Sequence, residues 1–127
     1  MGPSALSPGL RGEARRVVTD ESTAAALGSG DVPVLGTPAV LALIEQAACA
    51  AIAHALPDPD TSVGTWAELE HRAPSKIGAE VVATAELVAV DGRMLEFSCE
   101  VRDGSNVVAT ARHRRAVVDR ERFLARA

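Results

Sequence analysis

A single carboxylate interrupts the most apolar stretch of this 127-residue chain. Residues 38–56 consist almost entirely of Ala, Val, Leu, Ile and Cys, and Glu45 lies among them. If this stretch is a helix with about 100° of rotation per residue, Glu45 falls beside Leu41 and between Ile52 and Leu56, within the stripe of large apolar side chains. A helix that is apolar nearly all round is a buried helix. We therefore expect Glu45 to be a buried carboxylate.

A buried carboxylate indicates a functional site. Burying a bare charge costs several kcal/mol, so such a group is paired, hydrogen-bonded or neutral. Proteins tend to keep perturbed titratable groups where chemistry needs them. The structural alternative is that Glu45 faces a polar gap or caps a neighbouring strand.

Thr37 and His71 complete a set that suits general acid–base catalysis. Thr37 stands at the expected start of the helix, and His71 lies on the apolar face of the next expected strand. A carboxylate near an imidazole raises the pKa of the histidine and helps acid–base work near neutral pH. Thr37 and Glu45 are eight residues apart, which is about 12 Å along a helix axis. Each residue also has a structural explanation, Thr37 as an N-cap and His71 as a hydrogen-bonded core histidine.

Other polar side chains have weaker signals. His113 and Arg115 fall on the inner-pattern face of the last expected strand, where both can extend to solvent at the strand end. The basic run 112–115 is either a solvated patch or a contact for an anionic ligand such as a phosphate. His54 is expected to face solvent, and Trp66 to pack at a subunit contact.

Hydrophobic periodicity predicts the elements that position these residues. The helix is expected to begin near Thr37 as N-cap, with Pro38 at the first position, and to end before the Pro-Asp-Pro-Asp run 57–60. Period-two segments then predict strands at 62–72, 79–90, 93–103 and 106–118, with hairpin turns at Asp91-Gly92 and Asp103-Gly104. A weaker strand is expected at 11–20, a loop at 21–36 and a short helix at 119–126. This order indicates an α+β domain in which one long helix packs on an antiparallel sheet.

The alternation also predicts which strand residues face inward. The expected inward sets are Val63, Thr65, Ala67, Leu69 and His71; Leu95, Phe97, Cys99 and Val101; and Val107, Ala109, Ala111, His113, Arg115 and Val117.

Composition narrows the function. The length fits one domain with its own core, and 47% hydrophobic residues with mixed charges indicate a soluble globular protein. A net charge of −4, two Phe, one Trp and no Tyr argue against nucleic-acid binding. Cys49 and Cys99 lack the spacing of a zinc site and are expected to be small buried residues. The residues indicate neither a metal nor a cofactor.

Domain organisation and location follow from the same reading. Residues 1–10 are predicted to be a disordered tail, and residues 11–127 a single domain. The Pro-, Gly- and Ser-rich start has no apolar core of a signal peptide. Glu45, Gln46 and His54 make the apolar run 38–56 a buried helix and not a membrane span. A cytoplasmic protein is therefore expected.

Several of these segments together resemble the hotdog-fold acyl-CoA thioesterases, and most of all the fluoroacetyl-CoA thioesterase type. The resemblance covers roughly residues 14–124. It is carried by Gly36-Thr37 with Ile44-Glu45, by Val63-Gly64-Thr65, by His71 with Pro74 and Gly78, and by the closing RHRRAVVDRERF.

The resemblance implies both a fold and a function. The fold would be an antiparallel sheet wrapped around one long central helix, in a homodimer with active sites at or near the interface. The activity would be hydrolysis of an acyl-CoA or acyl-carrier thioester by a catalytic set of Thr37, Glu45 and His71. The backbone N–H of Gly64 would lie near the thioester oxygen, and Arg115 would bind substrate.

One segment departs from the family pattern. The fluoroacetyl-specific type carries phenylalanines in the loop before the helix, which form a lid over the acyl group, whereas residues 27–34 here contain no aromatic residue. The sequence leaves open the identity of the acyl group, a dimer or a tetramer, and whether Glu45 is a general base or a nucleophile. Two other functions also stay open, hydration or dehydration of an acyl thioester and non-catalytic binding of an acyl-CoA-type ligand.

Overall fold

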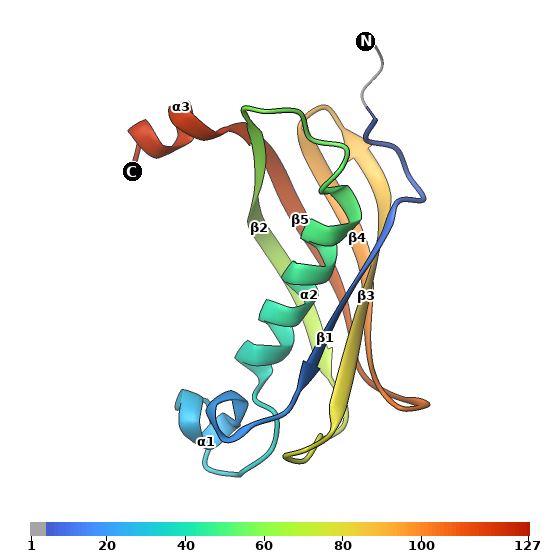
Figure 1. Cartoon of the computed structure of the whole chain (residues 1–127), viewed down its shortest axis with the longest axis vertical. Coiled ribbons are helices and arrows are strands. Elements are labelled where there is room, and N and C mark those ends of the chain that lie inside the picture. The colour runs from blue at the N-terminus through green and yellow to red at the C-terminus, as the bar shows by residue number, and fades with distance from the viewer. Residues whose placement is uncertain (1–4) are drawn as a thin grey trace.

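The chain folds into a curled antiparallel sheet that wraps around one long helix (Figure 1). The structure, a computed structural model, describes residues 5–127. The five strands stand in the order β1-β3-β4-β5-β2. The elements are β1 (Arg11–Val17), η1 (Asp20–Ser22), α1 (Ala24–Leu27), α2 (Thr37–Ile52), β2 (Asp60–His71), β3 (Glu80–Asp91), β4 (Met94–Asp103), β5 (Asn106–Asp119) and α3 (Arg120–Ala125). The expected order of a strand, a long helix and four further strands is confirmed.

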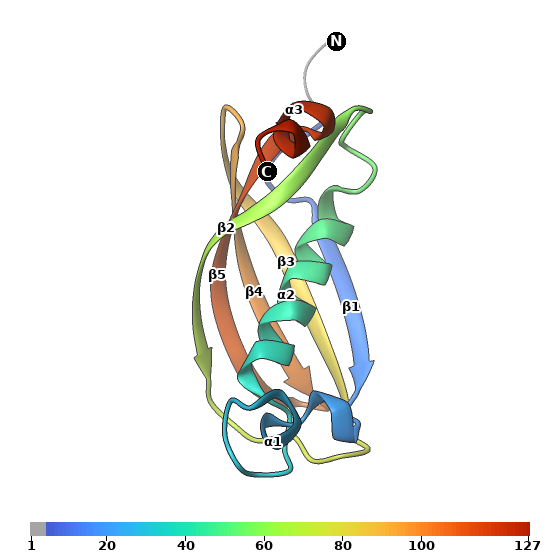
Figure 2. The same cartoon turned by 90° about the vertical axis from the view of Figure 1, so that its left-hand side faces the viewer.

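Helix α2 lies on the concave side of the sheet and packs most closely against β1 and β3. A Cβ on Gly12 of β1 would collide with the backbone of Ala47 and Ala51, so this strand and the helix meet with no side chain between them. The opposite face of α2, which includes Ala42, Cys49 and Ala50, is at least partly exposed. Figure 2 shows α2 between β1 and β2, with no helix or strand of the described residues over the face of α2 that points to the viewer. Residues 5–127 of a single chain therefore leave one apolar face of the central helix open.

The start of α2 differs from the sequence expectation, and its end agrees with it. Gly36 is the N-cap, and Thr37 is the first helical residue, so the expectation of Thr37 as N-cap is wrong. Its hydroxyl is hydrogen-bonded to His71 instead. The helix ends at Ile52, and residues 53–55 form turns before the predicted stop.

The hairpin predictions are confirmed. β3 and β4 are joined at Asp91-Gly92, and β4 and β5 meet at Asp103-Gly104. Gly92 and Gly104 both have φ of 60°, in the left-handed region that such turns require. The predicted inward set of β4 is buried: Leu95, Phe97, Cys99 and Val101.

Two irregularities change which residues face inward. The pairing of β2 with β5 shifts register between Gly64 and Trp66. Because one extra residue reverses the alternation, Ser62 and Gly64 face α2 before the bulge, as His71 does after it. The expectation that Val63 and Thr65 share a face with His71 is therefore wrong.

A second register shift, between Val101 and Arg102, lies opposite the start of β5. Val108 is buried there and Val107 is not, so the expected inward position of Val107 is also wrong.

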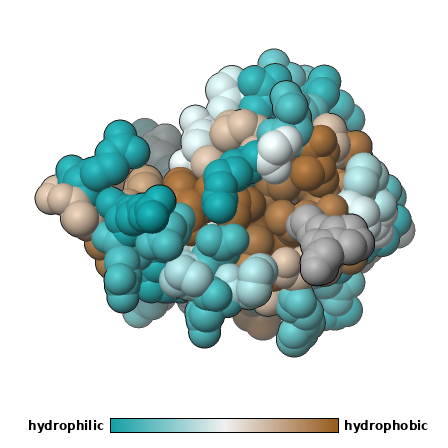
Figure 3. Space-filling view, turned by 90° about the horizontal axis from the view of Figure 1, so that it is seen from above, coloured by the Kyte–Doolittle hydropathy of each residue, from teal (hydrophilic) through white to brown (hydrophobic). Residues whose placement is uncertain are grey.

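The N-terminal segment contacts the domain before β1 begins. Residues 1–4 of the predicted tail lie outside the described residues. Leu6 and Leu10 pack against the core, and the N–H of Gly9 donates to the carbonyl of Leu87 at 2.8 Å. Figure 3 views this end of the molecule and shows apolar surface among hydrophilic side chains. The described residues therefore leave part of their apolar surface open at this end.

The two cysteines differ in environment. Cys99 is buried, and burial raises the pKa of its thiol to about 12, so the thiol stays neutral. Cys49 is exposed on the open face of α2, and the expectation that it is buried is wrong for the single chain. None of the helices among residues 5–127 is both long and apolar enough to cross a membrane.

Candidate active site

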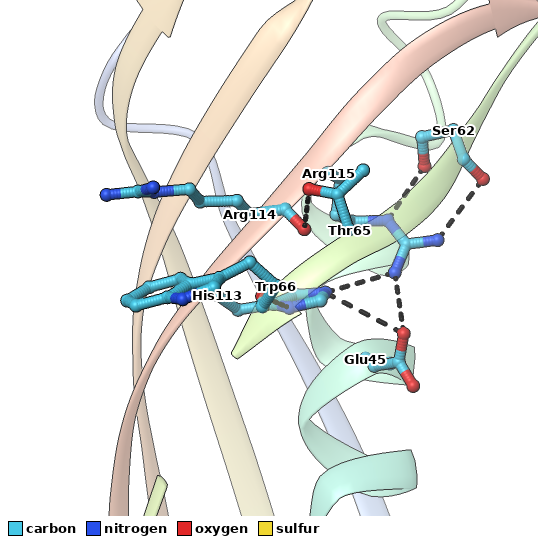
Figure 4. Close-up of polar contacts among 7 residues, drawn as sticks. All are labelled: Glu45, Ser62, Thr65, Trp66, His113, Arg114 and Arg115. Atoms are coloured by element: carbon cyan, nitrogen blue, oxygen red, sulfur yellow. Dashed lines mark hydrogen bonds and ion pairs between the residues drawn. The ribbon is translucent and has the colours of Figure 1, made fainter. Parts of the chain in front are cut away.

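Glu45 is partly exposed in the single chain. Its side chain keeps 40% of its surface accessible, so the expectation of a fully buried carboxylate is wrong here. Its Oε2 accepts a hydrogen bond from Nη1 of Arg115 at 3.2 Å, and Nε2 of His113 lies 3.8 Å away (Figure 4). The carboxylate is thus held by a guanidinium on one side and remains open on the other.

Arg115 is almost fully engaged by protein atoms. Its side chain is 7% exposed. Nε donates to Oγ of Ser62 at 2.9 Å, and Nη2 donates to the carbonyl of Ser62 at 3.2 Å. Nη1 contacts both Glu45 and Nε2 of His113, the latter at 3.1 Å. A guanidinium has five N–H donors, so these contacts leave little of Arg115 free for a ligand.

Gly64 lies directly over this cluster. A Cβ there would collide with Oε2 of Glu45 and would lie 3.3 Å from Cε1 of His113. Gly64 has no positive φ, so the lack of a side chain serves proximity and not backbone conformation. The main chain of β2 therefore passes close to the carboxylate.

His113 and Ser62 are the members of this cluster that sequence reasoning missed. His113 is 2% exposed, and its Nδ1 lies 2.9 Å from the carbonyl oxygen of Trp66. The alternation of polar and apolar residues predicted that His113 faces inward. It could not show whether the side chain is buried in the site or extends to solvent at the strand end. Ser62 carried no signal, because the bulge in β2 decides which way it faces.

The basic run 112–115 divides between two faces. His113 and Arg115 face inward, whereas Arg112 and Arg114 lie outside and both pair with Glu96. These two hydrogen bonds, that of Arg112 first, lower the pKa of Glu96. The guanidinium of Arg114 also stacks over the ring of Trp66, 4.3 Å from its centroid. The outer arginines are thus already paired with groups of the protein.

Thr37 and His71 form a second polar group, near the start of α2. Oγ1 of Thr37 and Nδ1 of His71 are hydrogen-bonded at 2.8 Å. Both residues line a cavity of about 360 Å³, together with Asp31, Val32 and Val34 of the loop before the helix. Nε2 of His71 is buried and has no side-chain or backbone partner within hydrogen-bond geometry in the described part of the chain.

Burial is the main influence on His71. It lowers the pKa of the imidazole, and the backbone of Ala73 offsets this only in part. The expectation that Glu45 raises the pKa of His71 is therefore wrong for the single chain. No hydrogen bond or ion pair joins these two side chains among residues 5–127. Thr37, which is hydrogen-bonded to His71, lies about 12 Å from Glu45 along the axis of α2, so the expected set is present as two groups.

Comparisons with known proteins identify the family of this chain. The profile of the fluoroacetyl-CoA-specific thioesterases matches residues 18–121. The fluoroacetyl-CoA thioesterase of Streptantibioticus cattleyicolor is 34% identical over 93 residues, which are 73% of this chain and 67% of that protein. The chain belongs to the fluoroacetyl-CoA-specific thioesterase family. It is a thioester hydrolase by family, as the sequence resemblance implies.

Solved structures of this family share the fold. A structure of the fluoroacetyl-CoA thioesterase FlK superposes with a TM-score of 0.88 at 30% identity, over 96% of this chain and 95% of that one. A variant of FlK in complex with acetyl-CoA gives 0.90 at 29% identity, over 95% and 96%. A thioesterase-superfamily protein of Thermus thermophilus gives 0.88 at 22% identity, over 98% and 91%, which bears on the fold alone. The predicted hotdog fold is confirmed.

Proposed function

We propose that this member of the fluoroacetyl-CoA-specific thioesterase family hydrolyses acyl-CoA thioesters with Glu45 as its central catalytic residue. The observation that carries the proposal is the state of that carboxylate. It is fixed at 3.2 Å from Arg115 and yet 40% exposed, so an incoming thioester can reach it. A carboxylate held in one place by a cation is pre-organised for attack or for proton removal.

Two routes are consistent with this geometry. In the first, Glu45 takes a proton from water, the water oxygen bonds to the carbonyl carbon, and the carbon–sulfur bond breaks to release the thiolate. In the second, an oxygen of Glu45 bonds to the carbonyl carbon and releases the thiolate, which leaves a mixed anhydride that water then hydrolyses. Both routes give a carboxylic acid and CoA.

The backbone N–H of Gly64 is our candidate donor to the developing oxyanion. It lies on a strand whose main chain passes close to Glu45, since Gly64 has no side chain to keep the two apart. A donor in such a position contributes about 3 kcal/mol to transition-state stabilisation.

Thr37 and His71 are proposed to act on the thioester from the other end of the site. Their hydrogen bond orients both side chains at the cavity before α2. Because burial keeps the imidazole neutral near pH 7, it can accept a proton from Thr37 or water, or donate a hydrogen bond to the leaving sulfur. In this role Thr37 orients the substrate.

We further propose that the enzyme is a homodimer, which completes these sites. Among residues 5–127, one side of β2 has no strand partner, and the adjacent face of α2 with Ala42, Cys49 and Ala50 is open. A second subunit over this face would bury Glu45 further and bring its own polar groups nearer. Light scattering should find a dimer or a tetramer, and a stable monomer at micromolar concentration would contradict this proposal.

A thiol-release assay over a panel of acyl-CoA and acyl-carrier thioesters tests the function. We expect turnover of at least some acyl-CoAs by the wild type. Binding without turnover would favour a ligand-binding module, and release of an enoyl or hydroxyacyl product without free thiol would favour a hydratase or dehydratase. A cytoplasmic location fits an acyl-CoA substrate, and cell fractionation tests it.

A further inference from the structure

We infer that His113 is a positioning residue of this enzyme, which acts as a neutral acceptor that holds the Arg115 guanidinium against the Glu45 carboxylate. The inference rests on the proposed function, because it assigns a role toward the same carboxylate. It adds a residue to which the catalytic set of Thr37, Glu45 and His71 gives no role.

The contacts of His113 specify one form of its imidazole. Nδ1 lies 2.9 Å from the carbonyl oxygen of Trp66. A carbonyl oxygen only accepts, so Nδ1 carries a proton. Nε2 lies 3.1 Å from Nη1 of Arg115, and a guanidinium nitrogen only donates. Both contacts are satisfied at once only by the neutral ring with its proton on Nδ1.

The surroundings of His113 favour this neutral form. Burial is the main effect and lowers the pKa of the imidazole, and the charge of Arg115 lowers it further. The carbonyl of Trp66 and the carboxylate of Glu45 act in the opposite direction without reversing the shift. A protonated ring would set an N–H of His113 against an N–H of Arg115, which breaks the contact.

The neutral ring helps to hold Nη1 of Arg115 in place. Ser62 of β2 holds Nε and Nη2 from another side of the planar guanidinium. Nη1 is the nitrogen that meets Glu45, and the other protein atom that holds it is Nε2 of His113. Figure 4 shows the ring and the guanidinium meeting at the carboxylate from two neighbouring positions on β5. His113 therefore orients the cation that orients Glu45.

Two substitutions separate the two hydrogen bonds of the ring. In His113→Asn, the side-chain amide can still donate to Trp66, but the acceptor toward Arg115 is lost. In His113→Gln, the amide oxygen can reach Arg115, but the donor toward Trp66 is lost. We expect kcat to fall about tenfold or more in His113→Asn, with KM changed by less than about threefold, and His113→Gln to recover much of that loss. His54→Asn, at an exposed position in the turn after α2, is the control and should match the wild type.

The inference would be overturned if His113→Asn and His113→Gln lost equal amounts of kcat, in proportion to their losses of melting temperature. His113 would then be a structural residue. A double-mutant cycle with Arg115→Met adds a second criterion. His113→Asn should cost little more once Arg115 is gone, and fully additive losses would contradict action through Arg115.

NMR of the imidazole nitrogens in the wild-type protein at pH 7 gives a readout that needs no turnover. The ring of His113 should carry its proton on Nδ1 only, and a proton on Nε2 would overturn the inference even in an active enzyme. Absence of thiol release by the wild type, with the Nδ1 proton present, would instead count against the proposed function while the arrangement of His113 stands.

Discussion

The side of Gly64 that faces α2 has no room for a methyl group. A Cβ there would collide with Oε2 of Glu45 and would lie 3.4 Å from Nη1 of Arg115. The colliding atom is the far end of a side chain that is 40% exposed, so the carboxylate can rotate toward solvent. We expect Gly64→Ala to move Glu45 away from Arg115 and to leave the backbone of β2 in place.

The two consequences differ greatly in size. Gly64 has no positive φ, so alanine fits its backbone and stabilises the fold by about 0.4–1 kcal/mol through the unfolded chain. Losing a partly exposed ion pair costs about 0.2–1 kcal/mol. These effects nearly cancel, and the free energy of unfolding should change by less than about 1 kcal/mol. A displacement of about 1 Å in a reacting group can cost about 10²-fold in rate, so kcat should fall by about that factor.

Gly12→Ala is the matched control for this substitution. Its Cβ would collide with backbone atoms of α2 at Ala47 and Ala51, and would lie 2.8 Å from the carbonyl carbon of Ala50. A helix backbone cannot rotate away, so overpacking should cost at least about 1–3 kcal/mol of unfolding free energy. This variant is a control for stability and not for rate, because the helix that would have to shift also carries Glu45.

Urea unfolding of both variants and thiol release by Gly64→Ala check the reasoning. Full activity in Gly64→Ala would show that the position of Glu45 against β2 does not matter for catalysis. A stability loss in Gly64→Ala as large as that in Gly12→Ala would show that the carboxylate cannot move aside.

Three further predictions concern the second polar group, pH and specificity. Thr37→Val removes the hydroxyl that bonds His71 and should lower kcat about tenfold or more. The melting temperature should change little, because Thr37 does not cap α2, and Thr37→Ser should keep most of the activity. A large loss of stability in Thr37→Val would argue against this role. The pKa values of His71 and His113 lie below 6.5 in the folded protein, so the unfolded chain binds more protons below that pH. The free energy of unfolding should therefore fall as pH drops below about 6.5 and level off below the folded-state pKa values, and urea titrations should show a shallower fall in His113→Gln; an unchanged slope would contradict this assignment. The loop 28–34 has no aromatic residue to seal the cavity. Discrimination between fluoroacetyl-CoA and acetyl-CoA should therefore stay near the low end of about 1–3 kcal/mol, and longer acyl chains should be accepted. A kcat/KM for fluoroacetyl-CoA several thousand times that for acetyl-CoA, with longer chains rejected, would refute this.

Local patterns were sufficient to predict most of the fold. The Asp-Gly pairs located both hairpins, and the alternation in β4 identified its buried face. The bulge in β2 could not be predicted, because one extra residue leaves no compositional sign and yet reverses the alternation before it relative to the alternation after it. For that reason Ser62, a direct partner of Arg115, was missed.

The site was predictable in residue type and less so in geometry. An acidic residue in an apolar helix singled out Glu45, but periodicity alone cannot tell whether a sheet, a partner subunit or solvent meets that face of the helix. The eight-residue spacing from Thr37 showed that a direct contact with Glu45 would need Thr37 to lie off the helix axis, but the sequence did not show that the set would form two groups. The protonation of His113 could not be inferred, because it depends on a carbonyl of β2 and a guanidinium that come together only in the folded chain.

The kcat of Glu45→Gln on the best substrate of an acyl-CoA panel, with its melting temperature, tests the central proposal most directly. Gln keeps the shape of the side chain but can neither remove a proton from water nor attack a thioester. We predict that kcat falls by at least about 10²-fold while the melting temperature stays the same or rises, since a partly buried charge has been removed. An unchanged kcat with a lowered melting temperature would show that Glu45 is a structural carboxylate and would contradict the proposal.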